Sequence, residues 1–138
     1  MRVLIDTNII LDFLLERDPF FQDAEILFQA IASERLEGYV SATTVTDIFY
    51  VARRQTQSID RARQAISSTL AVLNVCPIDG STLQAAFASE LRDFEDAVQL
   101  YCAIAQNLNA IVTRDAQGFS GTTLAVLSVS QLIELLEA

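Results

Sequence analysis

The chain has 138 residues, of which 51% are hydrophobic, and its formal net charge is −9. This length predicts a single domain over residues 1–138 with a substantial buried core, and the apolar content excludes an intrinsically disordered chain. The sequence contains neither histidine nor lysine, which excludes Ser-His-Asp and Cys-His nucleophile systems, the usual zinc sites and Schiff-base chemistry. The remaining carboxylates, amides, hydroxyls and arginines suit hard divalent cations best.

The apolar start of the chain does not resemble a signal peptide or a membrane span. Asp6, Asn8 and Asp12 interrupt it, and no apolar run elsewhere approaches membrane length. Cys76 and Cys102 are isolated thiols without metal-ligand spacing. We therefore expect no membrane association, and two reduced core cysteines in a cytoplasmic protein.

Residues 3–5, which follow Arg2, form a continuous apolar run that is typical of a strand buried on both faces of a parallel sheet. The run ends at Asp6, and Thr7 or Asn8 can begin a following helix. Ligands of open α/β sheets collect beyond the carboxyl ends of the strands, so Asp6 is a candidate functional carboxylate. The alternative is that Asp6 only caps the helix, and this stretch alone leaves both interpretations open.

Apolar spacing predicts the elements that follow in chain order. We expect helices over 9–16, from about 18 to a stop near Gly38, over 42–54, and from 57 or 58 to about 73. We expect short strands over 39–41, 74–78, 110–113 and 124–127, with a loop over 117–122. Pro77 places the strand at 74–78 near an edge of the sheet.

The later helices begin at recognisable capping residues. Asp79 and Asp93 are predicted N-caps, and Ser128 with Gln131 forms a capping box for the closing helix. The spacing also predicts inward-facing residues on these helices and on the one before them, among them Leu70, Leu83, Phe87, Phe94 and Ala105.

Strands that alternate with helices predict an α/β fold with three layers, in which helices flank a central, mostly parallel sheet of about five strands. Right-handed crossovers then place the carboxyl ends of the strands at one edge. Asp6 and Asp115 end strands there, while Asp47 and Asp96 lie near the starts of helices that face the same edge. Each acid alone can be explained as a helix cap or a first-turn acid. Four unneutralised carboxylates at one edge would repel one another, and a bound metal is the natural remedy.

These motifs resemble the PIN domain family, and most closely the VapC-like toxin ribonucleases. The resemblance is carried by Asp6-Thr7-Asn8 after a strand, Thr44-x-x-Asp47, Phe94-Glu95-Asp96-Ala97 and Thr113-Arg114-Asp115, in the family's order over essentially the whole chain. It implies a metal-dependent endoribonuclease that hydrolyses RNA phosphodiester bonds with Mg²⁺ or Mn²⁺. The implied catalytic and metal-binding quartet is Asp6, Asp47, Asp96 and Asp115.

The resemblance also assigns accessory roles. Asn8 matches a residue that positions water or a phosphate oxygen, and Thr113 matches the hydroxyl beside the last acid. The second acid of the family is commonly Glu, so Asp47 is one methylene shorter than usual. Asp93 is either an accessory acid or simply the N-cap of its helix.

Arginines supply the only basic side chains for an RNA substrate. The net negative charge argues against broad electrostatic binding of nucleic acid. Arg53, Arg54 and Arg114 are nevertheless possible contacts to the RNA backbone, as charge-assisted donors. Arg53 and Arg54 form a cluster with Arg61 and Arg63 that is either a local positive patch or a solvated helical face.

The resemblance implies protein partners as well. VapC-like toxins are held inactive by an antitoxin, often through a basic residue inserted into the acidic site, and a homodimer is expected. Phe13, Phe20 and Phe21 are candidates for such an interface, although we expect at least two of them to pack in the core.

Two other classes of function remain open. One is a PIN-fold interaction module that has lost catalysis. The other is a receiver domain or a haloacid-dehalogenase-type phosphatase, which the absence of lysine and of an Asp-x-Asp motif disfavours.

Overall fold

Five parallel strands form the centre of the molecule in the order β3-β2-β1-β4-β5. The structure is a computed structural model that describes residues 1–138. The strands are β1 (Arg2–Ile5), β2 (Glu37–Ser41), β3 (Asn74–Cys76), β4 (Ala110–Val112) and β5 (Ala125–Leu127). The helices are α1 (Thr7–Leu14), α2 (Phe21–Ala32), α3 (Ala42–Thr56), α4 (Ile59–Val72), α5 (Gly80–Ala88), α6 (Phe94–Ala105) and α7 (Val129–Glu137), with a 3₁₀ turn η1 over Ala116–Phe119.

The strand order contains one reversal, and it lies at β1. The chain runs outward from β1 through β2 to β3, and then returns to place β4 on the other side of β1. Ile5 of β1 lies opposite Val112 of β4 in register. Ligands of open α/β sheets bind where such a reversal occurs, beyond the carboxyl ends of the two strands.

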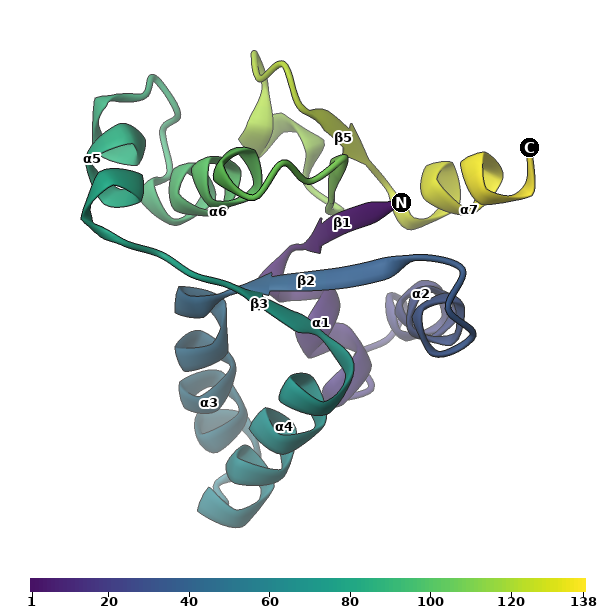
Figure 1. The fold of residues 1–138 in the computed structure, drawn as a ribbon. Helices are drawn as coiled ribbons and strands as arrows, with labels where there is room; N and C mark the ends of the chain where they lie inside the picture. Colours follow the sequence, from purple (N-terminus) through teal and green to yellow (C-terminus); the bar gives the residue numbers. More distant parts are fainter.

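Helices cover both faces of the sheet, which gives the expected three layers. Figure 1 shows α1, α2, α3 and α4 on one side of the sheet and α5 and α6 on the other. The side chains of β1 alternate accordingly, because Val3 and Ile5 belong to the core beneath α1 and α2, whereas Leu4 packs with α6. The buried Val129 and Leu132 of α7 belong to the same core as Val3 and Ile5.

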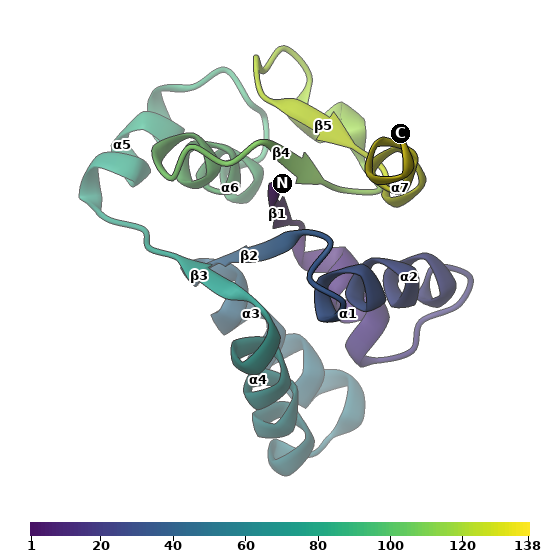
Figure 2. The same cartoon turned by 45° about the vertical axis from the view of Figure 1, so that its right-hand side comes forward.

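α3 and α4 form a hairpin that projects away from the sheet, as the turned view in Figure 2 shows. Ser41 caps α3 by accepting a hydrogen bond from the Thr44 amide, and Ser58 caps α4 in the same way. The start of α3 therefore stays at the sheet edge while its end extends outward.

Most predicted elements and caps are confirmed. The sheet is parallel throughout, β3 is an edge strand, Asp79 and Asp93 are N-caps, and Ser128 with Gln131 forms a capping box. Phe13 packs against the core and stacks on Phe21 and Phe28 with ring centroids 6.1 Å and 4.3 Å apart. Phe21 is half-buried and Phe20 is 40% exposed, so of the three candidates only Phe13 joins the core as expected.

Gly38 does not stop a helix, contrary to the prediction. α2 ends at Ala32, and Gly38 lies buried in β2. A Cβ at this position would lie 2.7 Å from Leu73 and 2.8 Å from Ile31. The glycine is required because side chains from two helices press against the strand, which the local sequence does not show.

Several side chains predicted to face inward are exposed. These are Leu70, Leu83, Phe87, Phe94 and Ala105. Phe87 is the extreme case, with 83% of its surface exposed. α5 packs against α6 rather than on the sheet, so it buries only a narrow strip around Ala86. No helix combines the length and apolar character that a membrane crossing requires.

Candidate active site

An acidic pocket of about 520 Å³ lies at the carboxyl ends of β1 and β4. Six of its twelve lining residues are acids, and one is a cation. The lining residues are Asp6, Thr7, Asn8, Leu11, Asp47, Tyr50, Val51, Arg54, Asp93, Glu95, Asp96 and Asp115. All four acids of the predicted quartet therefore face one pocket, together with Asn8, Asp93 and Arg54.

Each acid reaches the pocket from a different element. Asp6 directly follows β1, and Asp115 lies just beyond β4. Asp47 lies in the second turn of α3, and Asp96 lies in the first turn of α6, where its amide donates to Asp93 at 3.0 Å. The N-termini of α1, α3 and α6 thus meet at the pocket, and helix N-termini favour bound anions such as phosphate.

A chain of hydroxyls joins α1 to α3 below the pocket. Thr7 Oγ1 and Thr44 Oγ1 are 2.9 Å apart, and Ser41 Oγ donates to Thr44 Oγ1 at 2.9 Å. All three side chains are buried. This network fixes the start of α3 beside the start of α1, and so holds Asp47 on the same side as Asp6.

Asp6 is a buried carboxylate that does not cap its helix. It occupies the N-cap position of α1, yet its side chain makes no capping hydrogen bond. Gln99 Nε2 donates to Asp6 Oδ1 at 3.1 Å, and Thr113 Oγ1 donates to Asp6 Oδ2 at 2.7 Å. These contacts exclude the interpretation that the Asp6 side chain caps α1, because the carboxylate is held toward β4 and α6. A functional role for Asp6 stays a prediction.

The pocket accumulates negative charge that its own residues do not neutralise. A hydrogen bond with Asp47, together with burial, raises the pKa of Glu95 to about 7. Burial raises the pKa of Asp96 to about 6, and the charges of Asp93, Asp6 and Asp115 add to this effect. Arg54 is the one cation in the lining, so binding of an external cation would relieve the repulsion.

The donor set suits a divalent metal of the Mg²⁺ or Mn²⁺ type. Carboxylate oxygens are the ligands these hard ions prefer, and Mg²⁺ usually needs only one or two of them because it retains several waters. No group of three or more acids or cysteines is drawn close enough to enclose a metal ion by itself. The open arrangement therefore fits a metal that shares its ligands with water and substrate, rather than a closed structural site.

Arg114 does not reach the acidic pocket, although its position in the sequence suggests that it would. Although it lies between Thr113 and Asp115, its Nε donates to Asp12 Oδ2 at 2.7 Å and its guanidinium lies 3.7 Å from the centre of the Phe20 ring. The bond to Asp12 raises the pKa of Arg114. Neither Arg114 nor the exposed Arg53 lines the acidic pocket.

Sequence reasoning missed Glu95, Gln99 and Gly118. Glu95 lies beside the predicted Asp96, and Gln99 is the only polar residue in the buried run from Ala97 to Leu100; both features were visible signals. Gly118 gave no signal. A Cβ there would lie 2.7 Å from Asp96 Oδ2 and 3.4 Å from Asp115 Oδ2, so the backbone of η1 closes directly over the two acids.

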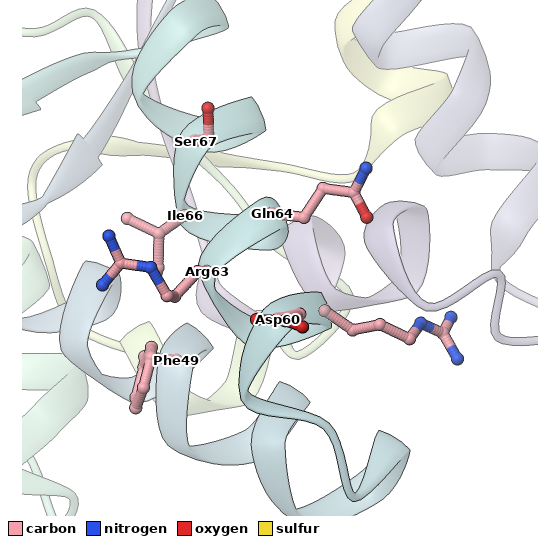
Figure 3. A pocket seen from close by; sticks show the side chains of 7 residues that line it. Phe49, Asp60, Arg63, Gln64, Ile66 and Ser67 are labelled. Carbon is pink, nitrogen blue, oxygen red and sulfur yellow. The ribbon is translucent and has the colours of Figure 1, made fainter.

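A second pocket, of about 740 Å³, is larger than the acidic pocket and shares no lining residue with it. It lies along α4 and the facing side of α3. Figure 3 shows Phe49 of α3 facing Ile66 and Arg63 of α4. Its charged residues are Asp60, Arg61 and Arg63, a set that offers no grouping of acids for metal chemistry.

The family of the chain follows from its match to a family model. The model of the PIN domain matches residues 2–117, which include every acid of the pocket. The chain belongs to the PIN domain family. A comparison with curated proteins found no match.

Several solved structures share this fold, and three of them contain a toxin or a VapBC complex. A toxin–antitoxin complex from Klebsiella pneumoniae is 24% identical, with a TM-score of 0.67, and the match covers 92% of this chain and 97% of that one. DNA-bound VapBC from Salmonella typhimurium is 14% identical, with a TM-score of 0.70 and coverages of 94% and 98%. Mycobacterium tuberculosis VapC20, a toxin that cleaves the sarcin-ricin loop, is 14% identical, with a TM-score of 0.68 and coverages of 89% and 98%. At these identities the similarity establishes the fold.

Proposed function

We propose that this PIN domain is an endoribonuclease that requires Mg²⁺ or Mn²⁺ and hydrolyses RNA phosphodiester bonds. The observation that carries the proposal is the pocket of six acids at the strand reversal, with only Arg54 to offset their charge. The fold of VapC20, which cleaves an RNA loop, supports RNA as the substrate.

Asp6, Asp96 and Asp115 would hold the metal together with water molecules, with Asp47 as the fourth acid of the quartet, because no three acids lie close enough to enclose an ion by themselves. A bound divalent cation supplies Lewis-acid chemistry, because it lowers the pKa of a water and stabilises negative charge on a phosphoryl oxygen. Glu95 lines the pocket with Asp47, whose interaction raises the pKa of Glu95, and it offers the longer carboxylate that Asp47 lacks. No histidine is required for this chemistry, in agreement with the sequence.

The remaining polar groups would bind the RNA. Asn8 is exposed at the pocket and can orient a water or a phosphate oxygen through its amide. Arg54 lies on the same face of α3 as Asp47 and can donate to a phosphate near the scissile bond. Arg53, exposed on the next face of α3, would contact the backbone farther along the strand.

We further propose that the protein is the toxin of a toxin–antitoxin pair. Several proteins of the same fold were solved as toxin–antitoxin complexes. The acidic pocket would accept an arginine or lysine of an antitoxin through charge complementarity, and a homodimer is the expected form of the toxin. Cys76 and Cys102 are buried and unpaired, which fits the reducing cytoplasm.

The test is cleavage of a labelled RNA with Mg²⁺, Mn²⁺ or EDTA. The wild type should cleave with either metal and not with EDTA, whereas Asp6→Asn and Asp96→Asn should reduce cleavage by at least about 100-fold, because removing a metal ligand should cost at least as much as removing an outer partner. Asp60→Asn is the matched control, since Asp60 is an exposed acid outside the pocket, and it should leave cleavage unchanged.

Cleavage that persists in EDTA, or that survives both pocket substitutions, would contradict the proposal. Binding of a protein partner without any cleavage would favour the silent interaction module instead.

A further inference from the structure

Gln99 is a buried polar residue whose contacts point to the acidic pocket. It lies on α6, three positions after Asp96, and only 1% of its surface is exposed. Its Nε2 donates to Asp6 Oδ1 at 3.1 Å, whereas its Oε1 is buried without a hydrogen-bond partner. The amide orientation follows from chemistry, because a carboxylate can accept a hydrogen bond from the NH₂ group but not from the carbonyl.

This arrangement is unfavourable for packing alone. An unpartnered buried carbonyl destabilises the fold, because it has lost its hydrogen bonds to water without replacing them. The neighbouring buried residues of α6 are apolar, among them Val98, Leu100 and Ala103. An apolar residue of similar size would avoid that cost. The benefit of Gln99 must therefore come from its one hydrogen bond, which is the bond to Asp6.

The bond restricts Asp6 without neutralising it. Gln99 and Thr113 each occupy one carboxylate oxygen, so the side chain cannot rotate freely. Both donors are uncharged, and each oxygen keeps lone pairs for a metal ion. A basic residue in the place of Gln99 would hold Asp6 equally firmly, but it would compete with the cation for the same charge.

We propose that Gln99 is a positioning residue, which holds Asp6 in the orientation that binds the divalent metal. The inference rests on the proposed function, since it assigns a role within the same site. Hydrogen-bond partners of metal ligands generally raise metal affinity by about 10–100-fold. Gln99 is placed to make such a contribution from the protein interior.

The test is calorimetric titration of Mn²⁺ into the intact protein and into Gln99→Met, which keeps the length of the side chain but removes the donor. We expect Mn²⁺ to bind Gln99→Met about 10–100-fold more weakly. Thermal unfolding in EDTA should be unchanged or shifted upward, because the unpartnered carbonyl is removed with the donor. A merely structural residue would lower the unfolding temperature and leave the affinity of the folded protein unchanged.

Thr69→Val is the matched control. Thr69 is also buried and polar, but its hydroxyl donates to the Ala65 carbonyl within α4, far from the acids in the fold. Its removal should leave Mn²⁺ affinity at the wild-type value. Gln99→Leu repeats the test with a different apolar shape in case Gln99→Met does not fold.

The outcomes separate the two proposals. Wild-type affinity in folded Gln99→Met or Gln99→Leu, with the intact protein binding Mn²⁺, would overturn the role of Gln99 alone. No Mn²⁺ binding by the intact protein would overturn both the role of Gln99 and the metal-dependent function. Weakened binding in the Gln99 variants but not in Thr69→Val would support both.

Discussion

Asp6 and Asp12 are both buried carboxylates at α1, but the protein treats them differently. Asp12 is 1% exposed and is neutralised by Arg17 at 2.9 Å and Arg114 at 2.7 Å. Asp6 is 7% exposed and receives only the neutral donors Gln99 and Thr113. A buried charge requires compensation. Asp12 receives it from two arginines and is a structural acid, and the lack of an ion pair at Asp6 supports the proposal that Asp6 binds a cation from outside.

Arg114 makes the comparison sharper. Its neighbours in the chain, Thr113 and Asp115, both serve the acidic pocket, yet its own guanidinium lies against Asp12 and Phe20. Arg114 thus forms its ion pair with Asp12, and its charge acts on Asp6 only without a hydrogen bond. Under the proposed function, this placement would leave the carboxylate oxygens of the pocket available for a metal.

The largest stability effect is expected at Asp12. Asp12→Asn leaves two guanidinium groups facing an uncharged amide, and breaking a buried pair costs about 3–5 kcal/mol. The two arginine side chains are 26% and 35% exposed, so solvent should reduce the loss to about 2 kcal/mol. Urea unfolding of the wild type and the variant measures the difference. A loss no greater than that of an exposed acid such as Asp60→Asn would contradict a structural role for Asp12.

Gly118→Ala should weaken metal binding in the acidic pocket, which contains Asp6. The added Cβ would lie 2.7 Å from Asp96 Oδ2, so either the acid or the backbone of η1 must shift. We expect about a 10-fold loss of Mn²⁺ affinity, comparable to disturbing the surroundings of a metal ligand. Gly80→Ala is the control, because nothing lies within 4 Å of a Cβ there. Equal affinities in the two variants would show that η1 does not shape the pocket.

The uncompensated charge should also make the metal-free protein sensitive to pH. The pKa values of Glu95 and Asp96 are raised from 4.5 to about 7 and from 3.8 to about 6 in the folded protein. At a pH between the ordinary and the raised pKa of either group, the folded state therefore binds more protons than the unfolded chain. Stability should therefore rise as the pH is lowered from about 8 to about 5.5 in EDTA.

Thermal unfolding across this pH range measures the effect. It should be modest, because Glu95 is exposed and Asp96 is only partly buried. A double variant with Glu95→Gln and Asp96→Asn should show a flatter profile. A wild-type stability that rises with pH over the same range would contradict the repulsion inferred for the pocket.

The smallest stability effect is expected at Phe20, which contacts the arginine that pairs with Asp12, Arg114. The ring centre lies 3.7 Å from the guanidinium carbon, and such cation–π contacts contribute about 0.5–1 kcal/mol at exposed sites. Phe20→Leu should lower the free energy of unfolding by that amount in urea. Phe87→Leu, at a ring that is 83% exposed, should lower the free energy of unfolding less. Equal losses in the two variants would show that the cation–π contact does not stabilise the fold.

Much of the fold could be predicted because its signals are local. The buried run of residues 3–5, the caps at Asp79 and Asp93, and the proline after β3 each depend on a few neighbouring residues. Gly38 was misassigned because a glycine is also required where distant side chains press on a strand. Phe87 and Phe94 were misplaced because helical spacing identifies an apolar face but not whether another layer covers it.

The meeting of the four predicted acids could be anticipated from the alternation of strands and helices, since parallel strands end, and the helices after them begin, at one edge. Their metal-binding roles stay predictions. The partners of the acids could not be anticipated, because Gln99 is 93 residues from Asp6 and Arg114 is 102 residues from Asp12. Only the packing of α6 and β4 on α1 reveals which carboxylate is neutralised.

The most direct test of this account is a Mn²⁺ titration of Asp6→Asn and Asp12→Asn, followed by electron paramagnetic resonance at a temperature where both variants are folded. We predict that Asp12→Asn binds Mn²⁺ with wild-type affinity and that Asp6→Asn shows no specific binding. Wild-type binding by Asp6→Asn would contradict the central claim that the carboxylate without a cationic partner is the one that holds the metal.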